Sequence, residues 1–139
     1  HDCEFNGTDV GIRLKSTRGR GGVVENIRIE DVAMERIRTE AIRINTHYRA
    51  WFSSNDGKAP TFRNIHIRRV MCESAGAAAR IVGLPEQPIE NLTIADVLLQ
   101  ARKGLYCEHI DGLQLLRAEV QPESGPAFRI EDCRNVQRQ

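Results

Sequence analysis

Two basic side chains near the start of this chain are spaced so that both could bind one anionic group. Arg13 and Lys15 stand two residues apart in Gly11-Ile12-Arg13-Leu14-Lys15-Ser16. In an extended strand, residues two apart lie on the same face. An arginine fork binds a carboxylate through two parallel hydrogen bonds, whereas lysine supplies a mobile point charge. The pair therefore predicts a site for a carboxylate of a ligand.

Further cations are expected on the same face, because later segments repeat the pattern of an arginine between apolar residues. Aligned with Arg13 are Arg43, Arg80 and Arg129, with Tyr106 standing once in place of arginine. Stacked like charges repel, so the column indicates a polyanionic partner. The alternative is a solvated face whose arginines pair with Glu40, Glu108 or Glu131. For Arg80 and Arg129 taken singly this alternative is favoured, and for Arg13 and Lys15 it is not.

The elements that would position these side chains recur along the chain. An Asn-apolar-x-apolar phrase begins at Asn26, Asn64 and Asn91 and degenerates at Gly112, with intervals of 38, 27 and 21 residues. A second strand, which carries the arginine column, follows each phrase after 13 to 15 residues. Two short strands per turn with loops of varying length predict an all-β fold, a right-handed parallel β-helix of about five coils. The length suits a single domain over residues 1–139.

The recurring asparagines have two interpretations. Stacked side-chain amides can hydrogen-bond from coil to coil. Alternatively, each asparagine only tolerates the left-handed backbone conformation of a turn. Both interpretations place Asn26, Asn64 and Asn91 at a corner of the coil.

The cysteines fit the core better than a metal site. Cys3 aligns with Val32, and Cys107 aligns with Ile44, so both are expected to point inward as small hydrophobes. No pair has zinc-like spacing, and no metal or other cofactor is expected. A disulfide in an oxidising compartment remains an alternative to free thiols, because four cysteines allow three pairings. The four are Cys3, Cys72, Cys107 and Cys133.

Composition gives little support to a nucleic-acid or membrane partner. The net charge is +1, and no apolar run is long enough to cross a bilayer. No signal peptide is present in residues 1–139. Residues 47–60 contain Trp51, Phe52 and an Asn55-Asp56-Gly57 turn signal, and they are expected to form a long projecting loop.

The first third of the chain resembles a known family of enzymes. The Arg13-Leu14-Lys15 segment, followed by Gly19-Arg20-Gly21-Gly22, resembles the Arg-Ile-Lys motif and Gly-rich turn of family 28 glycoside hydrolases, the polygalacturonases and their relatives. Ala41-Ile42-Arg43-Ile44-Asn45-Thr46-His47-Tyr48 resembles the strand that ends in the family's active-site tyrosine. The resemblance is strong over residues 1–48, and afterwards only the solenoid periodicity continues.

The resemblance implies binding roles for several residues. Arg13 and Lys15 would hold the carboxylate of a galacturonate ring beside the scissile bond, and Tyr48 would position the sugar. Second-rank candidates on adjoining segments are Arg18, Arg20, Arg43 and His47. The partner implied is an acidic, uronate-containing polysaccharide, and the location implied is secreted or periplasmic.

The resemblance also implies where the catalytic groups stand. The family inverts the glycosidic carbon with aspartates as general acid and base and a Gly-His-Gly histidine, all of which precede the Arg-Ile-Lys motif. Those motifs are absent here, so no catalytic residue is expected within the chain. Asp2, Asp9 and Asp31 are interpreted as turn residues, and His1 is not taken as the catalytic histidine.

The chain is therefore expected to be the C-terminal, substrate-binding part of a longer hydrolase. His1 aligns with the middle of a coil, and an open coil exposes core and strand edges. We expect the first coil to be covered by the preceding half of the protein or by a second copy. The rival hypothesis is a non-catalytic β-solenoid that binds polysaccharide or protein.

Overall fold

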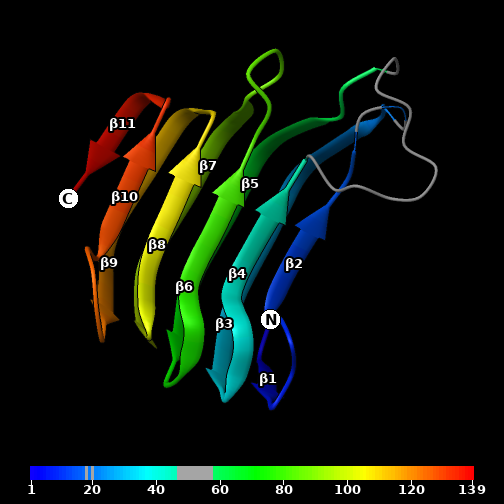
Figure 1. The fold of residues 1–139 in the computed structure, drawn as a ribbon. Coiled ribbons are helices and arrows are strands. Elements are labelled where there is room, and N and C mark those ends of the chain that lie inside the picture. The colour runs from blue at the N-terminus through cyan, green and yellow to red at the C-terminus, as the bar shows by residue number, and fades with distance from the viewer. Residues whose placement is uncertain (18, 20, 47–57) are drawn as a thin grey trace.

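The protein is a parallel β-helix built from two stacked sheets (Figure 1). The computed structural model describes residues 1–17, 19, 21–46 and 58–139, and every regular element in these ranges is a strand. The six-stranded sheet contains β1 (Cys3–Asn6), β3 (Val23–Glu35), β5 (Thr61–Cys72), β7 (Ile89–Ala101), β9 (Ile110–Pro122) and β11 (Arg134–Arg138). The five-stranded sheet contains β2 (Ile12–Lys15), β4 (Ile37–Asn45), β6 (Ala75–Val82), β8 (Lys103–Glu108) and β10 (Phe128–Glu131). The predicted fold class is confirmed.

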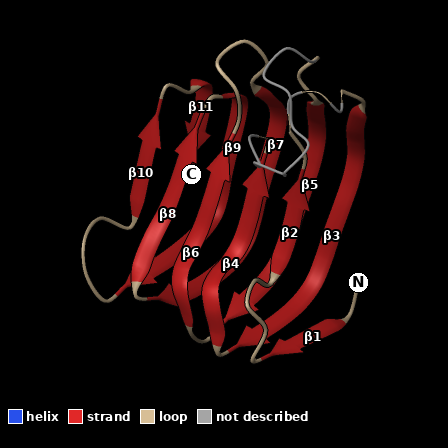
Figure 2. Cartoon of the chain, turned by 45° about the vertical axis from the view of Figure 1, so that its right-hand side comes forward, coloured by secondary structure: helices blue, strands red, loops and turns tan. Residues whose placement is uncertain are grey.

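Each coil contributes one strand to each sheet, and equivalent strands pair in parallel across neighbouring coils (Figure 2). In the six-stranded sheet Ile27 lies opposite Ile65, which in turn lies opposite Leu92 and then Leu113. The unequal intervals between the asparagine phrases therefore do not disturb the register, because the connecting segments absorb them.

In the coils that begin with β3, β5, β7 and β9, the first strand is longer than the sequence predicted. β3, β7 and β9 each have 13 residues and β5 has 12, in place of the short strand that was expected. Each contains residues with positive φ, such as Asp31 at 57° and Arg69 at 51° in β3 and β5. Since equivalent residues bend together in every coil, the backbone turns a corner without losing the pairing between coils.

Both interpretations of the recurring asparagines hold in the structure. Asn26, Asn64 and Asn91 have φ angles of 56°, 55° and 54°. The Nδ2 of Asn64 also donates to Oδ1 of Asn26, and the Nδ2 of Asn91 donates to Oδ1 of Asn64, each at 3.2 Å. Gly112 continues the column with φ 85° but has no amide to extend the ladder.

The core fills the space between the two sheets. Alternating apolar side chains of β4, β6, β7 and β8 point inward, and Ile44, Ile81 and Cys107 stack in one buried column. All four cysteines are free thiols. Cys3 lies opposite Val32 as predicted, but the expectation that it is buried is wrong, because its edge strand β1 pairs on one side only and leaves Cys3 exposed.

Among the described residues no helix is long and apolar enough to cross a membrane. Most of the long loop expected over residues 47–60 lies outside the described residues, which resume at Lys58.

Candidate functional site

The outward face of the five-stranded sheet carries the predicted basic column. Parallel pairing places Arg13 opposite Arg43, Arg43 opposite Arg80, Arg80 opposite Tyr106 and Tyr106 opposite Arg129. Neighbouring strands of a sheet lie about 4.8 Å apart, so the column spans all five strands at that spacing. The residues that flank each member point inward, because side chains alternate along a strand.

The end of this column at β2 contains the two residues singled out first. The side chains of Arg13 and Lys15 are exposed, while Ile12 is buried and Leu14 is half-buried against the core. Lys15 lies opposite Asn45 on β4. Two cations therefore project from one face of one short strand, which is the arrangement needed to bind a carboxylate from outside.

Arg43 stands next in the column and is half-buried. Its Nη1 lies 3.8 Å from Oε2 of Glu40, and the two side chains are 31% and 15% exposed. Among the described residues no hydrogen bond reaches that Glu40 oxygen, although it is buried. The alternative in which an arginine pairs with Glu40 is thus present, as a long ion pair between Arg43 and Glu40.

A glycine-rich turn follows Lys15 and fixes the end of β2. Gly19, Gly21 and Gly22 have φ angles of 96°, 57° and 82°, which other residues rarely adopt. The backbone N–H groups of Gly19 and Gly21 both donate to the carbonyl of Lys58 at 3.2 Å, and Thr61 donates to the carbonyl of Gly22. The turn is therefore held against the segment that leads into β5.

Four of the predicted site residues lie outside the described part of the chain. They are Arg18, Arg20, His47 and Tyr48. The described part therefore brings together Arg13, Lys15 and Arg43 among the predicted residues.

The far end of the column is organised around Tyr106. Guanidinium carbons of Arg80 and Arg129 lie 5.1 and 5.3 Å from the centre of its ring, one from each neighbouring strand. Its hydroxyl donates to Glu108 at 2.9 Å or to Glu131 at 3.0 Å. Partial burial, followed by these two carboxylate acceptors, raises the pKa of Tyr106 to about 12. The phenol therefore stays protonated and bridges the two glutamates.

The two arginines at this end differ in their partners. Arg129 pairs with Glu131, whose Oε1 lies 2.8 Å from its Nη2, as the sequence-level alternative expected. Arg80 has no carboxylate within 4 Å in the described part of the chain, and it stacks on the Tyr106 ring instead. The expectation of a glutamate partner for Arg80 is therefore wrong, because its neighbours in the column are Arg43 on one side and the aromatic ring of Tyr106 on the other.

A second polar cluster lies at the corner that follows β8 and β10. Ligand atoms of Glu108, His109 and Asp132 lie within 4.8 Å of one another, and His109 Nε2 is 3.4 Å from Glu108 Oε1. His109 and Asp132 both have positive φ, so they occupy equivalent corners of neighbouring coils. These atoms could approach one cation, although Glu108 already accepts from Tyr106. Sequence spacing did not indicate this cluster, because only the coil register brings it together.

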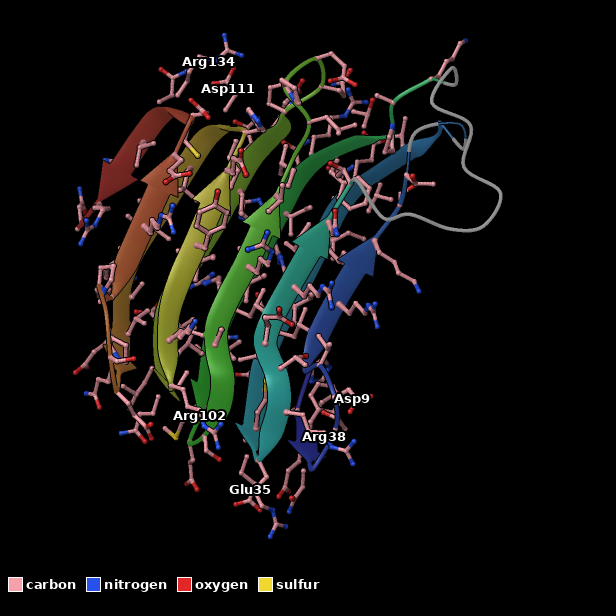
Figure 3. The ribbon with its side chains drawn as sticks, viewed as in Figure 1. Asp9, Glu35, Arg38, Arg102, Asp111 and Arg134 are labelled. Carbon is pink, nitrogen blue, oxygen red and sulfur yellow. The ribbon has the colours of Figure 1, made fainter. Side chains whose placement is uncertain are left out.

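The aspartates interpreted as turn residues stand at corners of the coils. Asp2 and Asp31 have positive φ, and Asp9 pairs with Arg38 at 3.3 Å. Figure 3 shows this pair near one end of the coils and another ion pair, Asp111 with Arg134 of β11, near the other, where the distance is also 3.3 Å. The carboxylates of Asp9, Asp31 and Asp111 link neighbouring turns, whereas Asp2 contacts the adjacent His1. None of these aspartates lies in the five strands that carry the arginine column.

In a comparison with known protein families, residues 1–117 match the model of the glycosyl hydrolases family 28. The chain is 28% identical over 130 residues to a "Probable polygalacturonase" of Vitis vinifera, which covers 86% of this chain and 26% of that protein. It is also 32% identical over 98 residues to an "Endo-polygalacturonase" of Pectobacterium parmentieri, which covers 70% of this chain and 23% of that protein. The chain thus spans about a quarter of the length of these curated relatives. No solved structure matches it.

Proposed function

Because this chain belongs to the family 28 glycosyl hydrolases, we propose that it is the substrate-binding part of a polygalacturonase-type enzyme. The substrate is a pectic polysaccharide containing α-linked galacturonate, cleaved with inversion. The observation that carries this proposal is the exposed pair of Arg13 and Lys15 on one face of β2, with Arg43 beside it.

The roles follow from the chemistry of the side chains. Arg13 binds the carboxylate of a galacturonate unit through its planar fork, and Lys15 adds a point charge that follows the same group. Tyr48 positions the sugar, with Arg20, Arg43 and His47 in supporting roles. The reaction needs no metal and no other cofactor.

The general acid and base are expected outside residues 1–139. The five strands that carry the arginine column contain no aspartate, and their carboxylates are Glu40, Glu108 and Glu131. Glu131 is engaged by Arg129 and Tyr106, and Glu108 by Tyr106. The family relationship further supports a protein that is secreted or periplasmic, where its polysaccharide is found.

The experiment measures release of reducing ends from polygalacturonate by the full-length protein. Arg13→Ala or Lys15→Ala is expected to lower kcat/KM by about 10- to 100-fold, since one contact to a charged group contributes roughly 1.5 to 3 kcal/mol. Arg68→Ala is the matched control, because Arg68 is an exposed arginine of β5 on the opposite sheet. Its activity should equal that of the wild type.

Two outcomes would contradict the proposal. Equal losses on free-acid and methyl-esterified substrate would show that the two cations do not bind the carboxylate. Binding of the polymer with no turnover by the full-length protein would favour the alternative, a non-catalytic β-solenoid that binds polysaccharide.

A further inference from the structure

The outward face of the five-stranded sheet is hollowed beyond Arg43, on the side away from Arg13 and Lys15. The hollow has a volume of about 560 Å³ and lies over β6 and β8, with Glu40 of β4 at one side and residues 124–126 at another. Ligand pockets for small molecules commonly have volumes of about 300 to 1,000 Å³. This hollow is therefore large enough for a sugar unit.

Small residues create the hollow. Ala77 stands between Glu40 and Lys103 in an outward column, and its short side chain leaves a gap between these two long ones. Gly104 borders the gap on β8, and a Cβ at this position would collide with the backbone carbonyls of Pro126 and Ala127. The turn before β10 therefore packs directly on Gly104 and closes that end of the hollow.

Positively charged side chains outnumber carboxylates around the hollow. Its lining includes three cations, Arg80, Lys103 and Arg129, and one carboxylate, Glu40. Arg129 is already paired with Glu131. Arg80 and Lys103 have no carboxylate within 4 Å in the described ranges of the chain. Two exposed cations thus face a concave surface that offers them no carboxylate partner from the described residues, which favours an anionic ligand.

Glu40, in contrast to the cations, favours a ligand that donates hydrogen bonds. Within the described part of the chain its Oε2 is buried without a hydrogen bond, and Nη1 of Arg43 lies 3.8 Å from it. That oxygen is closed off from the hollow, but the Glu40 side chain is 15% exposed and lines it, so a ligand hydroxyl would donate to the accessible part of this carboxylate. A ligand that combines carboxylates with hydroxyls fits both requirements, whereas a simple phosphate provides no comparable set of donors.

We propose that this hollow is a second binding site for an acidic sugar chain, in which Arg80 and Lys103 bind uronate carboxylates. The ring of Tyr106 acts as a positioning group, because it lies between the guanidinium groups of Arg80 and Arg129. A polysaccharide that crosses the strands from β2 would meet Arg13, then Arg43, and then the hollow. This inference rests on the proposed function, since it takes the same class of ligand.

The test measures affinities of the full-length protein for galacturonate oligosaccharides of increasing length. The wild type should bind longer oligomers more tightly until they reach the hollow. The double variant Arg80→Ala/Lys103→Ala should bind these long oligomers about tenfold more weakly, the sum of two exposed charge contacts. Its affinity for the shortest oligomers should be unchanged, and Arg68→Ala should match the wild type throughout.

The possible failures are distinguishable. If the double variant binds long oligomers as tightly as Arg68→Ala while Arg13→Ala binds weakly, the second site is refuted and the proposed function stands. If the wild type binds no acidic oligomer of any length, both the second site and the proposed function are refuted. A tenfold loss that is equal for fully methyl-esterified oligomers would also overturn the second site, because the cations would then not act through carboxylates. Displacement of long oligomers by inorganic phosphate at equal concentration would identify a general anion site instead of a sugar site.

Discussion

The side-chain amide of Asn64 donates to Oδ1 of Asn26 in the preceding coil at 3.2 Å, while its own backbone has φ 55°. One residue therefore serves two purposes at this corner. It tolerates the left-handed backbone, and it forms the middle of a ladder that continues to Asn91. The two contributions can be separated by substitution.

We expect Asn64→Gly to cost less stability than Asn64→Ala. Glycine keeps the left-handed backbone and loses only the two amide hydrogen bonds, each worth about 0.5 to 1.5 kcal/mol net. Alanine loses the same bonds and adds roughly 1 to 2 kcal/mol for a Cβ in the left-handed region. Denaturant unfolding of the full-length protein measures both values. Equal losses in the two variants would show that the backbone conformation contributes nothing.

Acid sensitivity should depend on two corner aspartates. Hydrogen bonds from Arg69 and Arg117 hold the pKa values of Asp31 and Asp96 below their usual 3.8. A carboxyl whose pKa is lowered on folding stabilises the fold above the pKa of the unfolded state, and this stability is lost as pH falls through the lower folded value. The expected loss therefore lies below about pH 4.

Asp31→Asn and Asp96→Asn should each be less stable at pH 7 and should show a flatter loss of stability on acidification. Unfolding midpoints measured from pH 7 to pH 2 give both quantities. Asp132→Asn is the matched control, because Asp132 is a corner aspartate with φ 49° and no ion pair to an arginine among the described residues. A pH profile of Asp31→Asn that parallels the wild type would exclude the linkage.

Gly104→Ala should destabilise the C-terminal end of the β-helix, where β10 lies. The added methyl would meet the carbonyls of Pro126 and Ala127, which belong to backbone and cannot move aside as a flexible side chain could. A cost of about 1 to 3 kcal/mol is expected for such overpacking. Hydrogen exchange of β8 and β10 amides would locate the effect.

Gly125→Ala provides the comparison for Gly104→Ala. No atom lies within 4 Å of a Cβ added there, but φ is 77°. Its cost should be limited to the backbone strain of roughly 1 to 2 kcal/mol. Faster exchange in β8 for Gly125→Ala than for Gly104→Ala would contradict the steric explanation.

The thiols should differ sharply in reactivity. Burial raises the pKa of the Cys107 thiol far above its usual range, whereas Cys3 is exposed. Since the thiolate is the reactive form, Cys3 should be alkylated in folded residues 1–139 while the first coil is uncovered, and Cys107 only after unfolding. Mass spectrometry after alkylation gives the order of modification. A Cys107 that resists alkylation even when the protein is unfolded would show that it is held in a disulfide.

The sequence alone determined the coil, its inward columns and the outward line from Arg13 to Arg129. This was possible because alternation along a strand and repetition between coils are both properties of residue order. The same reasoning failed for Cys3, since burial depends on what packs against both sides of a strand. It also underestimated the length of the first strands, because a bend at Asp31 does not interrupt pairing with a neighbour that bends at the same place.

Only the tertiary structure decided what the side chains on neighbouring coils do to one another. Arg80 meets the ring of Tyr106 instead of a glutamate, and Glu108, His109 and Asp132 converge although Asp132 belongs to the following coil. The hollow beside Arg80 exists because Ala77 and Gly104 are small at positions that the register brings together. These features depend on distances between coils, which vary with side-chain size and loop packing and are not encoded in the spacing of residues along the chain.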